Sequence, residues 1–365
     1  MATGVTNLGS GGFSLVPSIR GLARNRILIL VDGVRLTSDR RTGPSGSFVA
    51  PEDIEKIEVL RSPSSVFYGF DAVGGVIHIL TKQASTGRLL SGKAALRYGS
   101  INGEKGGGLS LQGRKGPAGY YLSFQGVDAG NYSSPKTAAY QAQRGGLRHK
   151  NDRGNALCQR PPLGRRLVPI GRLLAHPGLK PETGLSLDGG IKFMTGRLFA
   201  GLYGFVYSID DMIERYLVAE RTYTYGNIER GRIRGVEFEV EYFPVQGWKL
   251  FGNLYAMTGQ SLATELPLND VPPFRAALGI KAWAGRFSAE FETIFQTKKS
   301  VPGPAEIAIP GFSIFRSKAA YRLDSTLSVY AVISNLSDRT YLARPDPEAM
   351  EKPGRSLSLG LTFSF

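Results

Sequence analysis

Cysteine, histidine and tryptophan are scarce in this chain. Its 365 residues include one cysteine, three histidines and two tryptophans. The lone Cys158 cannot form an internal disulfide, so no cysteine framework stabilises the fold. His78, His149 and His176 lie far apart and lack the paired spacing of a zinc or haem site. We therefore expect no metal centre and no cofactor.

Long apolar runs are absent too. A helix that spans a membrane needs about 20 consecutive apolar residues. The apolar stretches here are short, like residues 27–31, which end at Asp32, so we exclude a helical membrane span. A membrane-spanning β-strand needs no such run, because only alternate residues face lipid. The mean hydropathy of −0.12 is compatible with that pattern.

Residues 1–10 contain no basic segment followed by an apolar core, so they predict no signal peptide. An exported protein would need one. Either the N-terminus is trimmed or mispredicted, or the polypeptide stays in the cytoplasm.

The formal net charge of +15 raises the question of a nucleic-acid partner. Nearly half of that excess lies in residues 141–172, where eight Lys or Arg residues stand against Asp152 alone. Charge gathered in one segment does not form an extended basic face. We therefore expect no nucleic-acid partner.

Glycine and aromatic residues are abundant by contrast. The chain has 47 glycines, 19 phenylalanines and 16 tyrosines. This composition favours many short strands and turns over long amphipathic helices. The fold class is therefore expected to be mainly β.

Residues 1–85 predict a small α+β domain. Pro51 suits the first position of a short helix, and Glu52 and Asp53 follow in its first turn. The apolar content is low for an independent core, which fits a domain enclosed by another structure. The expected strands of this domain are residues 27–31, 57–60 and 75–81.

From residue 90 onward, apolar and polar residues alternate. Within residues 236–242, the residues Val, Phe, Val and Tyr fall on one face and three glutamates on the other. Segments of about ten residues match tilted strands that cross a bilayer. A soluble β-sandwich or barrel is the alternative, since its strands alternate as well. The other expected strands are residues 92–98, 107–114, 119–127, 184–194, 197–208, 212–225, 227–235, 247–257, 274–284, 287–292, 311–322, 326–335 and 356–365.

Several motifs in residues 18–77 resemble the plug of TonB-dependent outer-membrane receptors, in the order and spacing of that family. They include Ser-Ile-Arg-Gly at 18–21, Ile-Leu-Val-Asp-Gly-Val-Arg at 29–35 and Ile-Glu-Lys-Ile-Glu-Val-Leu-Arg-Ser-Pro at 54–63. Ser62 replaces the usual glycine, and the TonB-contacting box is not recognisable. The plug-motif residues are Ile19, Gly21, Asp32, Gly33, Tyr68, Gly69, Gly74 and Gly75.

The C-terminal half resembles the barrel of the same family at residues 179–183, 234–237, 335–341 and 353–355. The final aromatic, Phe365, matches the signal read by the barrel-assembly machinery. The resemblance implies a transmembrane antiparallel β-barrel with roughly 13 to 14 of the family's 22 strands, together with a small α+β plug.

The chain then divides into four parts. Residues 1–85 form a partial plug, residues 86–137 the first barrel strands, and residues 179–365 the C-terminal barrel strands. Residues 138–178 form an anomalous basic segment rich in Arg and Pro. Our hypothesis is a large internal deletion at that segment, and a long surface loop is the alternative.

The resemblance also implies a function. A receptor of this family sits in the cell outer membrane and takes up a scarce nutrient actively, here a ferric siderophore or other iron chelate, without enzymatic chemistry. Its partners would be the TonB energy-coupling complex, outer-membrane lipid, the barrel-assembly machinery and a small metal chelate. The motifs do not distinguish siderophore, haem and cobalamin, and the ligand-binding residues stay unknown.

By motif position, two plug arginines are expected to face two carboxylates of the barrel wall. These are Arg20 and Arg61 on the plug, and Glu237 and Asp188 on the barrel, with Asp188 replacing the more usual glutamate. Lumen charges that bind only water are the alternative. Three other functions stay open: a passive porin-like channel, a cytosolic nucleic-acid binder, and a non-functional receptor fragment.

Overall fold

The computed structural model describes most of the plug and barrel regions. Tyr68, Gly69 and nearly all of the segment 138–178 lie outside the described residues. The described ranges are residues 4–7, 16–36, 49, 51–61, 72–83, 88–115, 118–130, 149–150, 172–173, 178–219, 222–347, 349 and 351–365.

The N-terminal region contains two small sheets. The first has the order β1-β2-β3 and is antiparallel. The second has the order β5-β4-β7-β6, in which β4 and β7 are parallel. The strands are β1 (Val5–Asn7), β2 (Pro17–Ile19), β3 (Leu22–Ala23), β4 (Ile27–Val31), β5 (Val34–Arg35), β6 (Ile54–Leu60) and β7 (Gly75–Thr81).

The expected strands 27–31 and 75–81 are confirmed with these bounds, and strand 57–60 begins earlier, at Ile54. The expected helix at Pro51 is a single 3-10 turn, η3 (Pro51–Asp53). A second 3-10 turn, η1 (Arg24–Arg26), connects β3 to β4. Among the described residues, no helix is long and apolar enough to cross a membrane.

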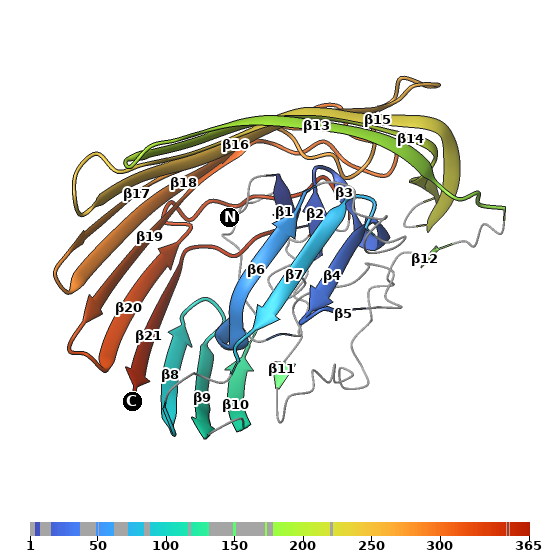
Figure 1. The fold of residues 1–365 in the computed structure, drawn as a ribbon. Helices are drawn as coiled ribbons and strands as arrows, with labels where there is room; N and C mark the ends of the chain where they lie inside the picture. The colour runs from blue at the N-terminus through green and yellow to red at the C-terminus, as the bar shows by residue number, and fades with distance from the viewer. Residues whose placement is uncertain are drawn as a thin grey trace.

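The second, large region is a 14-stranded sheet with the order β11-β10-β9-β8-β21-β20-β19-β18-β17-β16-β15-β14-β13, and β12 pairs with β15. It curves around the small sheets (Figure 1). Its strands are β8 (Ser91–Gly99), β9 (Glu104–Lys115), β10 (Ala118–Ala129), β11 (His149–Lys150), β12 (Arg172–Leu173), β13 (Thr183–Met194), β14 (Leu198–Ala219), β15 (Thr222–Tyr242), β16 (Trp248–Ser261), β17 (Arg275–Ala284), β18 (Phe287–Gln296), β19 (Phe312–Arg322), β20 (Leu327–Ser334) and β21 (Ser356–Ser364).

The last strand joins the two parts of this sheet. β21 pairs with β20 on one side and with β8 on the other, over residues 358–364 and 93–99. The two edges of the sheet are β11, next to β10, and β13. Within the described residues no strand connects these edges, so the sheet is open between them.

Three expected breaks between strands are wrong. We expect the segments 197–208 and 212–225 as separate strands, but β14 runs without a break from Leu198 to Ala219. Likewise β15 continues from Thr222 to Tyr242, across the expected breaks near residues 226 and 235, so the expected strand 212–225 combines the end of β14 with the start of β15. The two strands pair with each other almost throughout their lengths. The paired segment is longer than a strand needs to cross a bilayer.

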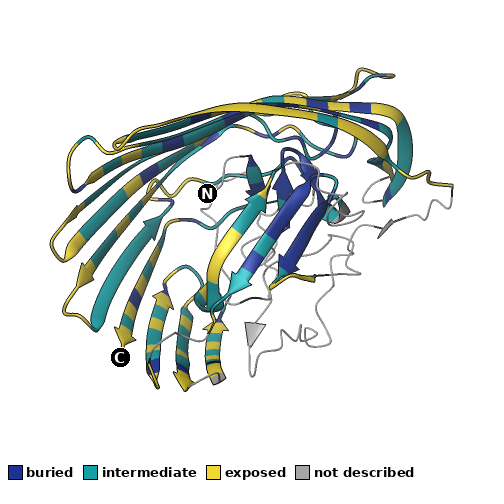
Figure 2. Cartoon of the chain, in the orientation of Figure 1, coloured by how far each residue is buried: buried dark blue, intermediate teal, exposed yellow. Residues whose placement is uncertain are grey.

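The two faces of the large sheet differ as the alternation predicts. On β15, Val236 is 48% exposed and Glu237 is 0% exposed. Along the strands, exposed and buried positions alternate in Figure 2. The exposed apolar side chains of the strands therefore point away from the enclosed region, unlike those of a soluble barrel, although β14 and β15 also place some apolar side chains toward it.

The connections differ between the two ends of the large sheet. At one end the strands join through short turns at residues 195–197, 243–247, 285–286 and 323–326. At the other end, residues 262–274, 297–311 and 335–355 form long connections, and residues 100–103 form a short one. Outer-membrane barrels have short periplasmic turns and long extracellular loops. Exposed aromatics lie near the short turns, as in an interfacial girdle: Tyr242, Trp248, Trp283, Phe287 and Tyr321.

An apolar core joins the small sheets to the barrel wall. Ile19, Ile27 and Ile29 belong to the same buried cluster as Tyr207 and Ile233 of the wall. The low apolar content of the N-terminal region explains this sharing, since the region completes its core against β14 and β15.

Candidate functional site: the contacts between plug and barrel

Arg20 projects from a tight turn between β2 and β3. Its φ of 51° and the φ of 82° at the following Gly21 lie in the left-handed region, which lets the chain reverse within two residues. The side chain leaves this turn toward the barrel wall and is 5% exposed.

The guanidinium of Arg20 meets a carboxylate in a two-point contact. Its Nε donates to Oε1 of Glu237 at 3.0 Å, and its Nη2 donates to Oε2 at 3.2 Å. This fork geometry is the strongest form of an arginine–carboxylate pair. Although burial lowers the pKa of Arg20, the hydrogen bonds that it donates to Glu237 and Tyr207 raise it overall, so the group stays charged.

The remaining donor of Arg20, Nη1, has three acceptors. It bonds to Asp188 of β13, to the Tyr207 hydroxyl at 2.8 Å and to the carbonyl of Arg61 at 2.9 Å. The Phe205 ring lies 4.3 Å from the guanidinium carbon, which gives a cation–π contact. Arg20 is therefore enclosed by three adjacent wall strands and by the plug itself.

Arg61 completes the cluster from the end of β6. Its Nη1 donates to Oε2 of Glu237 at 3.1 Å, and its Nη2 lies 3.9 Å from Oε1 of Glu239. Both oxygens of the buried Glu237 thus accept from plug arginines. The structure brings all four expected residues, Arg20, Arg61, Asp188 and Glu237, into one contact.

A second contact lies nearer the long loops, and the sequence reasoning missed it. Arg24 of η1 pairs with Asp270 in the loop 262–274. Arg26 donates through Nε to Glu182 at 3.0 Å and through Nη2 to the carbonyl of Ile213 at 2.7 Å. Glu182 belongs to the Lys-Pro-Glu-Thr motif that the sequence shows, but only the structure shows that its partner is Arg26.

The electrostatics of this second contact favour the charged forms. Burial lowers the pKa of Arg24, but the nearby carboxylate of Asp270 raises it overall. Burial likewise raises the pKa of Asp270, and Arg24 and Arg215 hold it below its ordinary value. Each ion therefore compensates the desolvation of its partner.

A third contact joins the plug to the opposite end of the sheet. Asp53 of η3 accepts from the Tyr121 hydroxyl at 3.0 Å and from Nε2 of Gln125 at 2.8 Å, both on β10. Glu52 pairs with Arg97 on β8. The plug is thus bonded to β13–β15 on one side and to β8 and β10 on the other.

The other expected motif residues form turns. Asp32 accepts from the backbone nitrogen and the hydroxyl of Thr81, at 2.8 and 2.6 Å, and these bonds lower its pKa. Gly33, with φ 84°, donates its N–H to Nε2 of His78 at 2.9 Å. A Cβ at Gly74 would lie 2.7 Å from Cβ of Leu22, so the close approach requires glycine.

Phe365 fixes the end of the chain to the first barrel strand. Its carbonyl accepts from the N–H of Gly92 at 2.9 Å, and its own N–H donates to the Gly92 carbonyl at 3.0 Å. A Cβ at Gly92 would collide with the Phe365 ring, so glycine makes room for the ring.

Two protein-family models match the chain. Residues 117–336 match "TonB dependent receptor-like, beta-barrel", and residues 1–76 match "TonB-dependent Receptor Plug Domain". Both halves of the fold described above therefore have counterparts in one family.

Curated relatives match over short segments. An iron-regulated outer membrane virulence protein of Vibrio cholerae is 47% identical over 88 residues, which is 22% of this chain and 13% of that protein. The ferrienterobactin receptor of Escherichia coli K12 is 40% identical over 93 residues, or 23% of this chain and 12% of that protein. A vitamin B12 transporter of Vibrio vulnificus is 41% identical over 99 residues, covering 27% of this chain and 16% of that protein.

Solved structures share the fold over the whole chain. The copper transporter OprC has a TM-score of 0.78 at 15% identity, covering 100% of this chain and 94% of that one. The FrpB iron transporter of Neisseria meningitidis has a TM-score of 0.75 at 11% identity, with coverages of 100% and 96%. With a plug model over residues 1–76, a barrel model over residues 117–336 and this shared fold, the chain belongs to the TonB-dependent receptors.

Proposed function

We propose that this chain is an outer-membrane receptor that takes up a ferric siderophore or another iron chelate actively. The observation that carries the proposal is the plug, a folded domain bonded to the concave side of the sheet through three charged contacts. A passive channel would have no use for such a domain, because the plug occupies the path that a solute would take.

The type of contact supports a plug that can be displaced. Arg97 and Glu52 are 29% and 35% exposed, so they regain hydrogen bonds with water when they separate, and breaking this pair costs less than breaking a buried one. The apolar cluster shared with β14 and β15 adds a second, more permanent attachment. Displacement would then begin on the side of β8 and β10, where the contacts are polar.

Relatives indicate the nutrient class. Their names include an iron-regulated outer membrane protein and two receptors for ferric enterobactin. A vitamin B12 transporter also matches, so cobalamin is the competing ligand. The partners we propose are the TonB energy-coupling complex, outer-membrane lipid and the barrel-assembly machinery, which would read the strand that ends at Phe365.

Uptake by cells tests the proposal. A strain without its own iron-chelate and cobalamin receptors would express the chain and receive ferric enterobactin carrying radioactive iron or labelled cobalamin, with and without TonB. We expect iron accumulation that requires TonB. Equal uptake in both strains would indicate a passive channel, and TonB-dependent uptake of cobalamin alone would refute the iron assignment.

One observation favours a second candidate, a receptor fragment that does not transport. Within the described residues the sheet is open between β10 and β13, and an open edge leaves backbone groups without partners in a membrane. Such a fragment would give no accumulation of either ligand above cells that carry the empty vector.

A further inference from the structure

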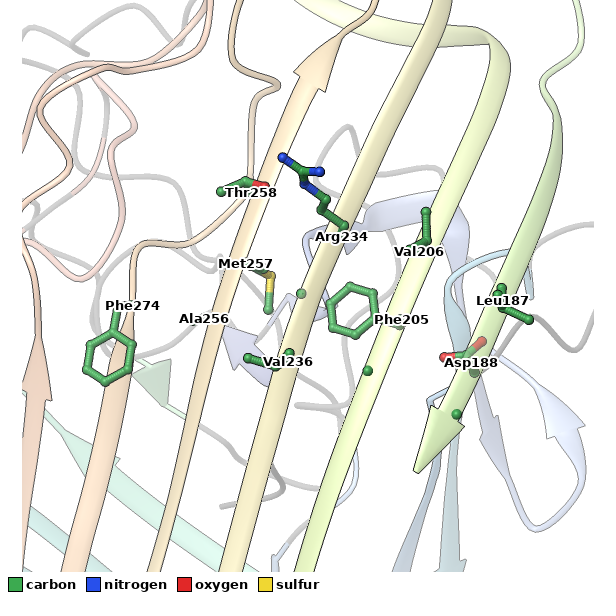
Figure 3. A pocket seen from close by; sticks show the side chains of 13 residues that line it. Leu187, Asp188, Phe205, Val206, Arg234, Val236, Ala256, Met257, Thr258 and Phe274 are labelled. Atoms are coloured by element: carbon green, nitrogen blue, oxygen red, sulfur yellow. The ribbon is translucent and has the colours of Figure 1, made fainter. Parts of the chain in front are cut away.

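An apolar groove lies on the outer face of the large sheet, away from the plug. It crosses β13 to β16 and ends beside the start of β17, with a volume of about 740 Å³ (Figure 3). Cross-strand pairing places most of the lining residues on the outer face, since Leu187 lies opposite Val206, and Gly204 lies opposite Val236. Asp188, Phe205, Gly235 and Met257 also line it, but they alternate with these positions and face the plug. The residues that shape it are Leu187, Gly189, Gly204, Val236, Ala256 and Phe274.

Glycines make the floor of this groove. A Cβ at Gly189 or at Gly204 would meet no atom within 4 Å, so the space above both residues is open. Gly235, next to them on the inward face, differs, because a Cβ there would lie 2.8 Å from the Phe205 ring. Gly189 and Gly204 therefore leave open space on the outer face, whereas the Phe205 ring fills the space beside Gly235 on the inner face.

Two arginines lie at the end of the groove nearer the long loops. Arg234 lines the groove, and Arg232 follows on the same face of β15. Their cross-strand neighbours are uncharged: Ser208 and Gln260 for Arg232, Val206 and Thr258 for Arg234. Among the described residues, no carboxylate forms an ion pair with either arginine, whereas the next one along, Arg230, pairs with Asp210.

The height of these arginines matches a lipid headgroup. Arg234 and Arg232 lie 8 and 10 residues from Tyr242, which ends β15 at the short turn. At about 3.4 Å per residue and a tilt of about 40°, they lie about 21 and 26 Å above that end. The apolar band of such barrels is about 25 Å tall, so both guanidiniums reach its outer boundary.

We propose that this groove binds a phosphate-bearing lipid of the outer leaflet, with an acyl chain along Gly189 and Gly204 and the phosphate between Arg232 and Arg234. The proposal rests on the membrane location argued above. Charge complementarity determines the occupant: a cationic end needs an anion, and guanidinium forms two parallel hydrogen bonds with phosphate. The apolar floor next to that end requires the same molecule to carry a hydrocarbon chain.

Native mass spectrometry of the purified, detergent-solubilised chain tests the proposal. The probes are dioleoyl phosphatidylglycerol, dioleoylglycerol with the same chains but no phosphate, and inorganic phosphate. We expect phosphatidylglycerol to bind about tenfold more tightly than dioleoylglycerol, as one lost charged hydrogen-bond pair predicts. Equal binding of the two lipids, or displacement of phosphatidylglycerol by millimolar phosphate alone, would overturn the proposal.

Two variants separate the ends of the groove. Arg232→Gln with Arg234→Gln should weaken phosphatidylglycerol binding about tenfold, and Gly204→Leu should weaken it similarly by filling open space. The controls are Arg197→Gln, at the short-turn end, and Gly126→Leu, on β10, where a Cβ also meets nothing within 4 Å. Unchanged binding in both groove variants, or equal losses in the controls, would contradict the assignment.

Lipid binding and uptake are separate readouts. The mass measurement uses folded protein in detergent, with circular dichroism as the check of the β-fold, and needs neither an iron chelate nor TonB. A failed uptake assay with intact, phosphate-dependent lipid binding would refute only the proposed function. Intact uptake with no preference for phosphatidylglycerol would refute only the lipid site.

Discussion

At the scale of single residues, Arg20 is the most constrained side chain of the plug. It combines a left-handed backbone, burial against three wall strands and a two-point bond to a carboxylate that is itself fully buried. Removal of one partner from such a pair leaves an uncompensated charge, which costs about 3 to 5 kcal/mol. The contact therefore holds the plug most strongly when both charges are present.

Charge exchange tests this pair. Arg20→Glu should weaken docking of the plug by about 3 to 5 kcal/mol, because two carboxylates then face each other. Adding Glu237→Arg should recover part of the loss. Limited proteolysis of the plug in the folded barrel measures docking. If the double variant is cleaved as fast as the single variant, the pair does not hold the plug.

Within the elements, the glycines of the plug differ in what they make possible. Gly75 begins β7 with φ 135°, and a Cβ there would collide with the carbonyl of Leu60 in the neighbouring strand β6. Gly33 has φ 84° in the turn between β4 and β5, yet nothing lies within 4 Å of its Cβ position. Glycine at position 75 therefore allows β7 to approach β6, whereas glycine at position 33 is needed only for the left-handed φ of the turn.

Alanine substitution should separate the two roles. Gly75→Ala adds a clash to backbone strain and should destabilise the plug by about 3 kcal/mol, whereas Gly33→Ala should cost about 1 kcal/mol. Hydrogen exchange of the β6–β7 amides reports the difference. Equal loss of protection in both variants would show that backbone strain alone accounts for the cost.

At the scale of the whole molecule, the plug connects both ends of the sheet. Arg26 and Glu182 secure it at β13, and Asp53 bonds to Tyr121 and Gln125 on β10. Within the described residues these two strands do not pair with each other, so the plug is the structure that bridges them. The curvature of the sheet in Figure 1 follows the plug.

Heat-modifiable gel migration tests this bridge. A folded barrel migrates differently before and after boiling. We expect Arg26→Gln combined with Asp53→Asn to lower the temperature at which the folded band disappears, because both anchors are lost. The control is Lys56→Gln, at an exposed pair with Glu58, which should leave this temperature unchanged. The same transition temperature in all three proteins would show that the plug does not support the sheet.

The sequence by itself determined the strands and the outward apolar face. Alternation and glycine turns are local, so β4, β7, β13 and β19 follow from residues close in the chain. It misplaced the breaks in β14 and β15, since pairing between two long strands overrides local turn signals. The four charged residues of the main contact were found by family resemblance, not by spacing.

Only the tertiary structure decided the charge pairs that no motif predicted. Arg24 and Asp270 lie 246 positions apart, so no local pattern couples them. The groove beside Arg234 likewise depends on glycines from two different strands that register places side by side. The physical reason is that ion pairs and grooves depend on distances in space, whereas alternation depends only on the period of the strand.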